Sequence, residues 1–158
     1  MMELFFKPRS VAIVGASGSP GKLGYVIVNN IKGSDFAGAV YPVNPKADEI
    51  LGYKVYKTIA EIPGAVDLVI TALPTPKMTV STLEECAQKG VKAVIIESAG
   101  FAEMGGEGKV YQQQIVDIAK KNNIRVMGPN CSGIVSRDIV TSIYPMTKKV
   151  SRGNVVLI

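Results

Sequence analysis

Short apolar runs alternate with amphipathic segments along most of the chain. The apolar runs, which predict strands, lie at 11–14, 39–43, 66–73, 93–97 and 124–127. Apolar residues at helical spacing predict helices at 23–33, 76–89 and 109–122. Near-continuous apolar strands that alternate with helices are typical of a parallel sheet covered on both faces. The pattern therefore predicts an α/β fold, a doubly wound Rossmann-like parallel sheet with helices on both faces and right-handed crossovers.

Proline and glycine mark the ends of the predicted helices. Pro76 begins the second helix, at a position where the missing N–H of proline costs no hydrogen bond. Gly33 and Gly90 predict the ends of the first two helices. A shorter segment at 52–56 separates the second strand from the third. Ligands of doubly wound sheets bind beyond the carboxyl ends of the strands, so the loops that follow the strands are the candidate sites.

The first strand runs directly into a glycine-rich loop. Its glycines recur every third residue, at Gly15, Gly18, Gly21 and Gly24, and the residues between them include Ser17, Ser19 and Pro20. Main-chain N–H groups of such a loop can approach an anion closely, and the next helix directs its partly positive end to the same place. The spacing is not that of the dinucleotide fingerprint. The loop predicts an adenine nucleotide held through its phosphates, and the alternative is a tight turn without a ligand.

The second strand ends at Val43 and continues into Asn44, Pro45 and Lys46. A NAD-binding domain places an acidic residue near this point to bind the ribose hydroxyls, and no acid stands at this strand end. Lys46 instead offers a cation to a phosphorylated ribose. Two common ligands carry one, NADP and coenzyme A (CoA). The alternative for Lys46 is a solvated surface lysine.

The composition is that of one compact domain. The chain has 158 residues, of which 47% are hydrophobic, enough for a substantial core. It shows neither a secretory signal nor an apolar run long enough to span a bilayer, which predicts a cytoplasmic protein without a membrane partner. There is no histidine, and the two cysteines, Cys86 and Cys131, lie far apart, so no metal site is expected. The net charge of +5 is scattered, so no nucleic-acid partner is expected.

Four loops, taken together and in order, resemble a known family. They are the segments 14–17, 41–46, 98–103 and 128–133, which read VGAS, YPVNPK, SAGFAE and GPNCSG. This combination resembles the CoA-binding domain of NDP-forming acyl-CoA synthetases, which include succinyl-CoA synthetase alpha subunits and ADP-forming acetyl-CoA synthetases. The resemblance covers essentially the whole chain, and it implies that the chain binds CoA or acyl-CoA.

The resemblance also implies roles for individual residues. The phosphates would lie against Ser17, Gly18, Ser19 and Pro20, the charged nucleotide end at Lys46, the cofactor along Leu73 and Pro74, and the pantetheine along Ser98 and Ala99. The predicted cofactor-binding set also includes Gly15, Val43 and Asn44 at the ends of the first two strands. Asn130 would orient the thiol end of the cofactor or the phosphohistidine of a partner domain, or it would cap the following turn.

The phosphohistidine of this family has no counterpart here, because the chain contains no histidine. In the family that residue belongs to a second domain, and an ATP-grasp module handles the nucleotide. We therefore predict that residues 1–150 form a CoA-binding domain that is not catalytically complete alone. The apolar segment 151–158 predicts the first strand of a truncated second domain, or a strand that completes the sheet. The alternatives are a freestanding CoA-binding or CoA-sensing protein and an NADP-dependent oxidoreductase domain.

Overall fold

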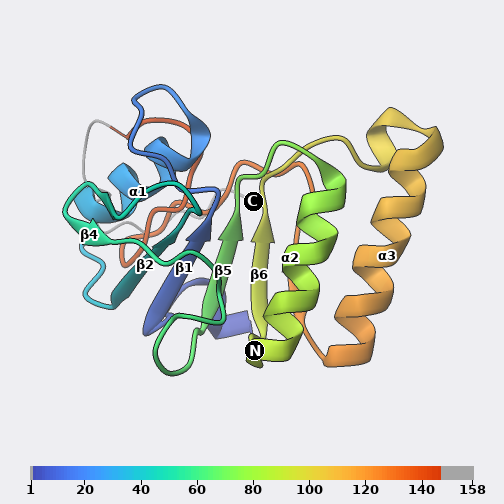
Figure 1. Ribbon diagram of the computed structural model, residues 1–158, viewed down its shortest axis with the longest axis horizontal. Helices are drawn as coiled ribbons and strands as arrows, with labels where there is room; N and C mark the ends of the chain where they lie inside the picture. The colour runs from blue at the N-terminus through green and yellow to red at the C-terminus, as the bar shows by residue number, and fades with distance from the viewer. Residues whose placement is uncertain (1, 147–158) are drawn as a thin grey trace.

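The computed structural model describes residues 2–146, which fold around one parallel sheet (Figure 1). The sheet has five strands in the order β2-β1-β5-β6-β7. They are β1 (Ser10–Val14), β2 (Ala39–Val43), β5 (Leu68–Thr71), β6 (Ala93–Ile96) and β7 (Arg125–Met127). Every neighbouring pair is parallel, which confirms the predicted α/β class. All carboxyl ends consequently lie along one edge, at the top of Figure 1.

Helices cover both faces of the sheet. They are α1 (Leu23–Gly33), α2 (Pro76–Lys89) and α3 (Gly106–Asn122), with short 3-10 turns η1 (Met2–Phe5) and η2 (Ala102–Met104). Ile13 packs in a core with Ile27 of α1, whereas Val14 packs in the core on the other face with Leu83 of α2 and Ile115 of α3. Successive strand residues point to opposite faces, and burial on both faces explains why the strands are apolar throughout.

The helix boundaries follow local chemistry. Pro76 is the first residue of α2, and the hydroxyl of Thr75 before it accepts the N–H of Met78 at 3.3 Å. Gly90 ends α2 in the left-handed conformation, with φ of 80°. α3 begins three residues earlier than predicted, at Gly106, so its first turn lies in the glycine-rich stretch that sequence patterns assign to a loop. An added Cβ at Gly108 would collide with the carbonyl oxygen of Phe101, so this glycine lets α3 pack closely against the preceding loop.

The segment between β2 and β5 differs from a simple connection. β3 (Glu49–Ile50) and β4 (Tyr53–Lys54) form a separate antiparallel pair. Leu51 and Gly52 form their turn, both at positive φ. The segment at 52–56 therefore contains one arm of a hairpin, and its last residue, Tyr56, forms a parallel bridge with Val43 of β2. β5 is shorter at both ends than the predicted strand at 66–73.

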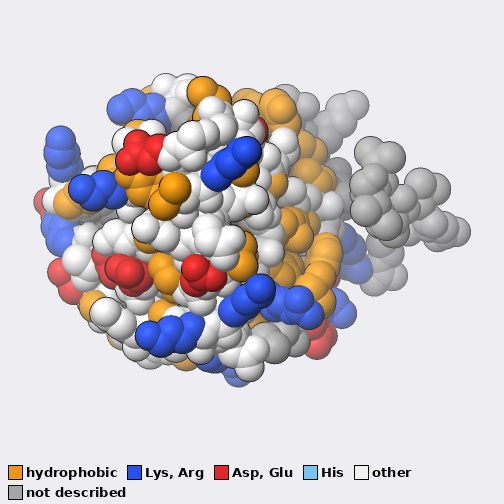
Figure 2. Space-filling model, turned by 90° about the vertical axis from the view of Figure 1, so that its right-hand side faces the viewer, with side chains coloured by type: hydrophobic (Ala, Val, Ile, Leu, Met, Phe, Trp, Pro, Cys, Tyr) orange, Lys and Arg blue, Asp and Glu red, His pale blue; other side chains and the backbone are white. Residues whose placement is uncertain are grey.

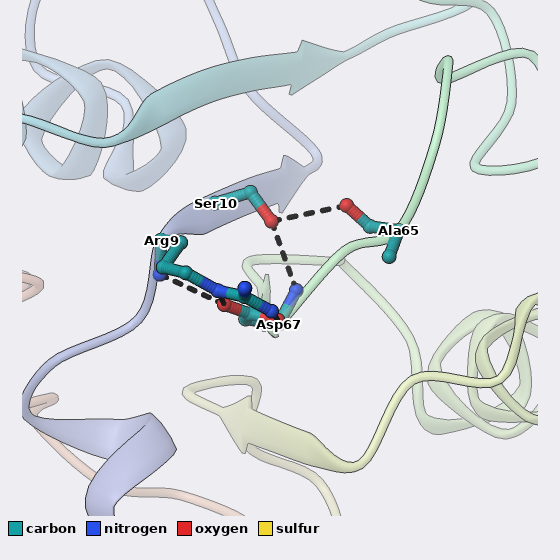
Figure 3. A network of polar contacts seen from close by, with 4 residues as sticks. All are labelled: Arg9, Ser10, Ala65 and Asp67. Carbon is teal, nitrogen blue, oxygen red and sulfur yellow. Dashed lines mark hydrogen bonds and ion pairs between the residues drawn. The ribbon is translucent and has the colours of Figure 1, made fainter.

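A polar network joins β1 to β5 at the amino edge of the sheet (Figure 3). The carboxylate of Asp67 accepts the backbone N–H of Arg9 at 2.9 Å and its guanidinium Nε at 3.1 Å. The hydroxyl of Ser10 donates to the carbonyl of Ala65 and accepts the N–H of Asp67. Arg9 holds the pKa of Asp67 below its ordinary value, and the largest cause is the side-chain hydrogen bond between them. The network fixes the register of the two strands opposite the edge where the loops gather.

After β7 the chain returns to the α1 side. Ile134 and Ile139 are buried there in the same core as Ile27. The predicted strand at 151–158 and the predicted domain boundary at 150 lie outside the described residues. Among the helices that the structure describes, none has the length and apolarity needed to cross a membrane.

Candidate functional site

A pocket of about 840 Å³, called here the main pocket, lies at the carboxyl ends of β1, β2 and β5. It is bordered by the three loops that follow these strands, by the first turn of α1 and by one face of α2. β1 lies between β2 and β5, so these three loops belong to adjacent strands. This is the part of a doubly wound sheet where ligands bind.

The glycine-rich loop brings the start of α1 against the end of β1. Gly15 has a φ of 88°, and a Cβ added there would collide with the carbonyl oxygen of Ala72. A Cβ added at Gly24 would collide with the carbonyl oxygen of Gly15, so the helix can approach the loop only with glycine at this position. Lys22 precedes α1 as its N-cap residue, and the Lys22 side chain makes no capping hydrogen bond. The first N–H groups of α1 therefore present partial positive charge beside the pocket.

The structure brings only part of the predicted loop to the pocket. Gly15 and Ser17 border it, and the hydroxyl of Ser17 accepts the N–H of Ser19 at 3.0 Å. Gly18, Ser19 and Pro20 are exposed on the outer part of the loop and do not border the main pocket. Their contact with phosphates stays a prediction.

The predicted residues after β2 all border the pocket. Asn44 donates its side-chain amide to the carbonyl of Ala16 at 2.7 Å and accepts the N–H of Lys46 at 2.8 Å. Lys46 is exposed at the pocket, and its ammonium has no partner within residues 2–146. Val43 is buried at the strand end. The arrangement places an unpaired cation beside the glycine loop.

Some pocket residues were missed by sequence reasoning. Lys57 borders the pocket, and its ammonium contacts the carboxylate of Asp48 and the carbonyl of Ala47, each at 2.7 Å. This hydrogen bond, with the attraction between the charges, lowers the pKa of Asp48. No sequence signal marks Lys57, because the contact depends on how the segment at 49–56 folds.

One face of α2 also borders the pocket. It carries Met78, Ser81, Thr82 and Glu85, whose spacing of three, four and seven residues from the first is that of one helix face. This spacing was available in the sequence. It was overlooked because the apolar face of α2, with Leu83 and Cys86, explained the helix by itself.

Ser98 lies between two loops at the sheet edge. Leu73 and Pro74 border the main pocket, and the N–H of Leu73 donates to the hydroxyl of Ser98 at 2.9 Å. Asn130 donates its backbone N–H to the carbonyl of Ser98 at 3.0 Å. Ser98 is buried, whereas Ala99 and Asn130 are exposed, and none of the three borders the main pocket. The structure thus brings these predicted residues together beside the pocket.

The capping alternative for Asn130 has no support within residues 2–146. No helix begins after Asn130 there, and its side chain makes no hydrogen bond. Cys131 follows it, and burial, with a smaller contribution from Glu97, raises the pKa of its thiol. This thiol is therefore a weak nucleophile at neutral pH.

Charges are mixed on the side of the molecule that carries α3. Figure 2 shows Lys and Arg side chains interspersed with Asp and Glu side chains on this face. Within residues 2–146 no group of three or more His, Cys, Asp or Glu side chains is arranged to hold a metal ion.

Comparison with known proteins identifies the family. The family described as CoA binding domain matches residues 9–137. The alpha subunit of the ADP-forming acetate-CoA ligase II of Pyrococcus furiosus is 48% identical over 136 residues, which cover 86% of this chain and 29% of that subunit. The ADP-forming acetate-CoA ligase II of Archaeoglobus fulgidus is 44% identical over 162 residues, which cover 100% of this chain and 23% of that protein. The chain thus spans less than a third of these relatives.

Solved structures share the fold. A Pyrococcus horikoshii OT3 protein matches with a TM-score of 0.87 and 42% identity, over 94% of this chain and 34% of that one. The dinucleotide forming acetyl-coenzyme A synthetase 1 of Ca. Korarchaeum cryptofilum, solved with phosphate and ADP, matches with a TM-score of 0.86 and 32% identity, over 92% of this chain and 31% of that one. The resemblance read from the four loops is confirmed: the chain belongs to the CoA-binding domain family and is homologous to part of the ADP-forming acyl-CoA synthetases.

Proposed function

We propose that this chain binds coenzyme A or its acyl thioester in the main pocket, as the CoA-binding domain of an ADP-forming acyl-CoA synthetase. The observation that carries the proposal is that the ammonium of Lys46, which has no partner in the described part of the chain, and the uncapped start of α1 border the same pocket. CoA carries anions at two places on its adenosine, a 5′ pyrophosphate and a 3′ phosphate. The helix start suits the pyrophosphate and Lys46 suits the 3′ phosphate.

The pantetheine arm would leave the pocket past Leu73 and Pro74, toward Ser98, Ala99 and Asn130. The hydrogen bonds from Leu73 and Asn130 to Ser98 support this path, because they hold the two loops side by side. The hydroxyl of Ser98 already accepts the N–H of Leu73. The main role of Ser98 in this proposal is therefore to position the loops along which the pantetheine arm would lie.

Catalysis requires further protein parts in this proposal. The chain covers less than a third of the two acetate-CoA ligase proteins described above, and none of its 158 residues is a histidine that could carry a phosphoryl group. A second ligase domain would supply the phosphohistidine, and an ATP-grasp subunit would supply the nucleotide site.

Thermal melts with four ligands test the proposal. CoA at a hundred times its dissociation constant should stabilise the chain by about 2.7 kcal/mol, and dephospho-CoA at the same concentration by less, because it lacks the 3′ phosphate. The Lys46→Ala variant should lose most of the difference between the two ligands. The matched control is Lys121→Ala, which removes an exposed lysine of α3 that does not border the main pocket.

NADP and NAD complete the set of ligands. We expect neither to stabilise the chain as CoA does. Stabilisation by NADP without stabilisation by CoA would contradict the proposal and favour the oxidoreductase alternative.

A further inference from the structure

Asn44 joins the two loops that border the main pocket on its β1 and β2 sides. Its side-chain Nδ2 donates to the carbonyl of Ala16 in the glycine loop, and its Oδ1 accepts the backbone N–H of Lys46. Only one orientation of the amide satisfies both contacts, because a carbonyl accepts and an N–H donates. The backbone N–H of Asn44 also donates to the carbonyl of Tyr56 at 3.0 Å. One residue therefore ties together three segments that are distant in sequence.

The turn that carries Lys46 is also held from its far side. The ammonium of Lys57 contacts the carbonyl of Ala47 and the carboxylate of Asp48. Within residues 2–146, the ammonium of Lys46 is left without a partner, although the backbone around it is fixed on both sides. A fixed backbone with a free charged group is the arrangement expected of a preorganised anion site.

The geometry points to Asn44 as a positioning residue that sets the separation between the glycine loop and Lys46, so that the two anion subsites bind one ligand together. This inference rests on the proposed function. The sugar fixes the spacing between the 5′ pyrophosphate and the 3′ phosphate, so both groups can be bound at once only if the two subsites stand at a matching distance. Without the Asn44 bridge, the Lys46 turn can move away from the glycine loop. The 3′ phosphate then adds less to the affinity for CoA.

The test is a double-mutant cycle measured by isothermal titration calorimetry with CoA and dephospho-CoA. The wild type, Asn44→Ala, Lys46→Ala and the double variant are compared by the ratio of their affinities for the two ligands. Lys46→Ala should reduce the preference for CoA about tenfold, the size of one charge-assisted contact. Asn44→Ala should reduce it several-fold although the ammonium remains. The double variant should lose no more than Lys46→Ala alone, since both changes remove the same interaction.

Asn44→Ser is the matched variant for the geometry, because it adds no charge. Its hydroxyl can still accept the N–H of Lys46, as in a serine turn, but it is too short to replace the amide that donates to Ala16. It should also lower the preference for CoA, and it carries the test if Asn44→Ala does not fold. Circular dichroism melts establish folding for each variant.

Two results would overturn the inference: equal weakening of both ligands in the Asn44 variants, or additive losses in the double variant. Either result would leave the proposed function intact if the wild type still prefers CoA. A wild type that binds neither ligand would instead contradict the proposed function itself.

Discussion

The carboxyl group of Glu97 is buried directly after β6, and within residues 2–146 neither of its oxygens has a hydrogen-bond partner. The residue is 4% exposed. Burial raises its pKa to about 8. A carboxyl group in this state is protonated in the folded chain at neutral pH and ionised in the unfolded chain. The free energy of unfolding therefore depends on pH through the proton that Glu97 binds in the folded chain.

We expect the free energy of unfolding to fall as the pH rises from about 4.5 to about 8, because the folded chain binds one more proton than the unfolded chain in this range. The slope contributed by one group approaches about 1.4 kcal/mol per pH unit. Glu97→Gln should remove this slope, as measured by urea denaturation at a series of pH values.

Glu103→Gln is the control for this prediction. Glu103 is exposed and accepts the N–H of Gly100, which lowers its pKa, so the variant should leave the slope between pH 5 and 8 unchanged. A wild type whose stability is flat over this range would show that Glu97 is ionised or partnered in solution.

At the scale of one element, α1 depends on where its glycines stand. Gly24 lies in its first turn, where an added Cβ would collide with the carbonyl oxygen of Gly15. Gly33 lies at its last residue, where an added Cβ meets nothing within 4 Å. The same helix thus contains a glycine required by packing and a glycine that packing does not require.

Gly24→Ala should lower the free energy of unfolding by about 2 kcal/mol, the usual cost of forcing extra volume against backbone. Gly33→Ala should leave it unchanged or raise it by up to about 1 kcal/mol, because alanine favours the helix. Urea denaturation of the two variants checks both outcomes. Equal effects would mean that the approach of α1 to the glycine loop is not tight.

Gly24→Ala has a second consequence. The displaced loop carries the N–H groups proposed for the pyrophosphate, so this variant should also weaken CoA and dephospho-CoA together. This differs from the Asn44 variants, which should change mainly the ratio between the two ligands.

At the scale of the whole molecule, Asn30 ties α1 to the chain that follows β7. Its buried Nδ2 donates to the carbonyls of Ser142 and Tyr144, both at 2.8 Å, and its Oδ1 accepts the N–H of Met146 at 3.0 Å. These partners are more than 110 residues away in sequence. One buried side chain thus fixes the path of the segment that leaves the sheet.

Asn30→Ala should lower the free energy of unfolding by about 2 kcal/mol, because it leaves the buried carbonyl of Ser142 and the partly buried backbone groups of Tyr144 and Met146 without this partner. Hydrogen exchange at residues 142–146 should accelerate more than exchange in β1. The neighbouring Asn29→Ala, which changes an exposed residue of the same helix, should alter neither quantity. Uniform acceleration across the sheet would indicate global destabilisation instead of local release.

The amino-acid sequence by itself determined the elements and their order. Apolar runs, helical spacing, Pro76 and Gly90 act over a few neighbouring residues, so the strands, α1 and α2 were predicted close to their observed bounds. The four loop motifs by themselves identified the family. Lys46 was recognised because it stands three residues after a strand whose end is visible in the pattern.

Only the tertiary structure decided how these loops are held relative to one another. The Asn44 bridge, the contact of Lys57 with Asp48 and the burial of Glu97 join or enclose residues from separate segments. The hairpin of β3 and β4 was likewise missed, because its strands are two residues each and leave no periodicity to detect. Short-range patterns encode which backbone conformation a segment adopts, whereas contacts between distant segments form only when the sheet has fixed their distance and direction.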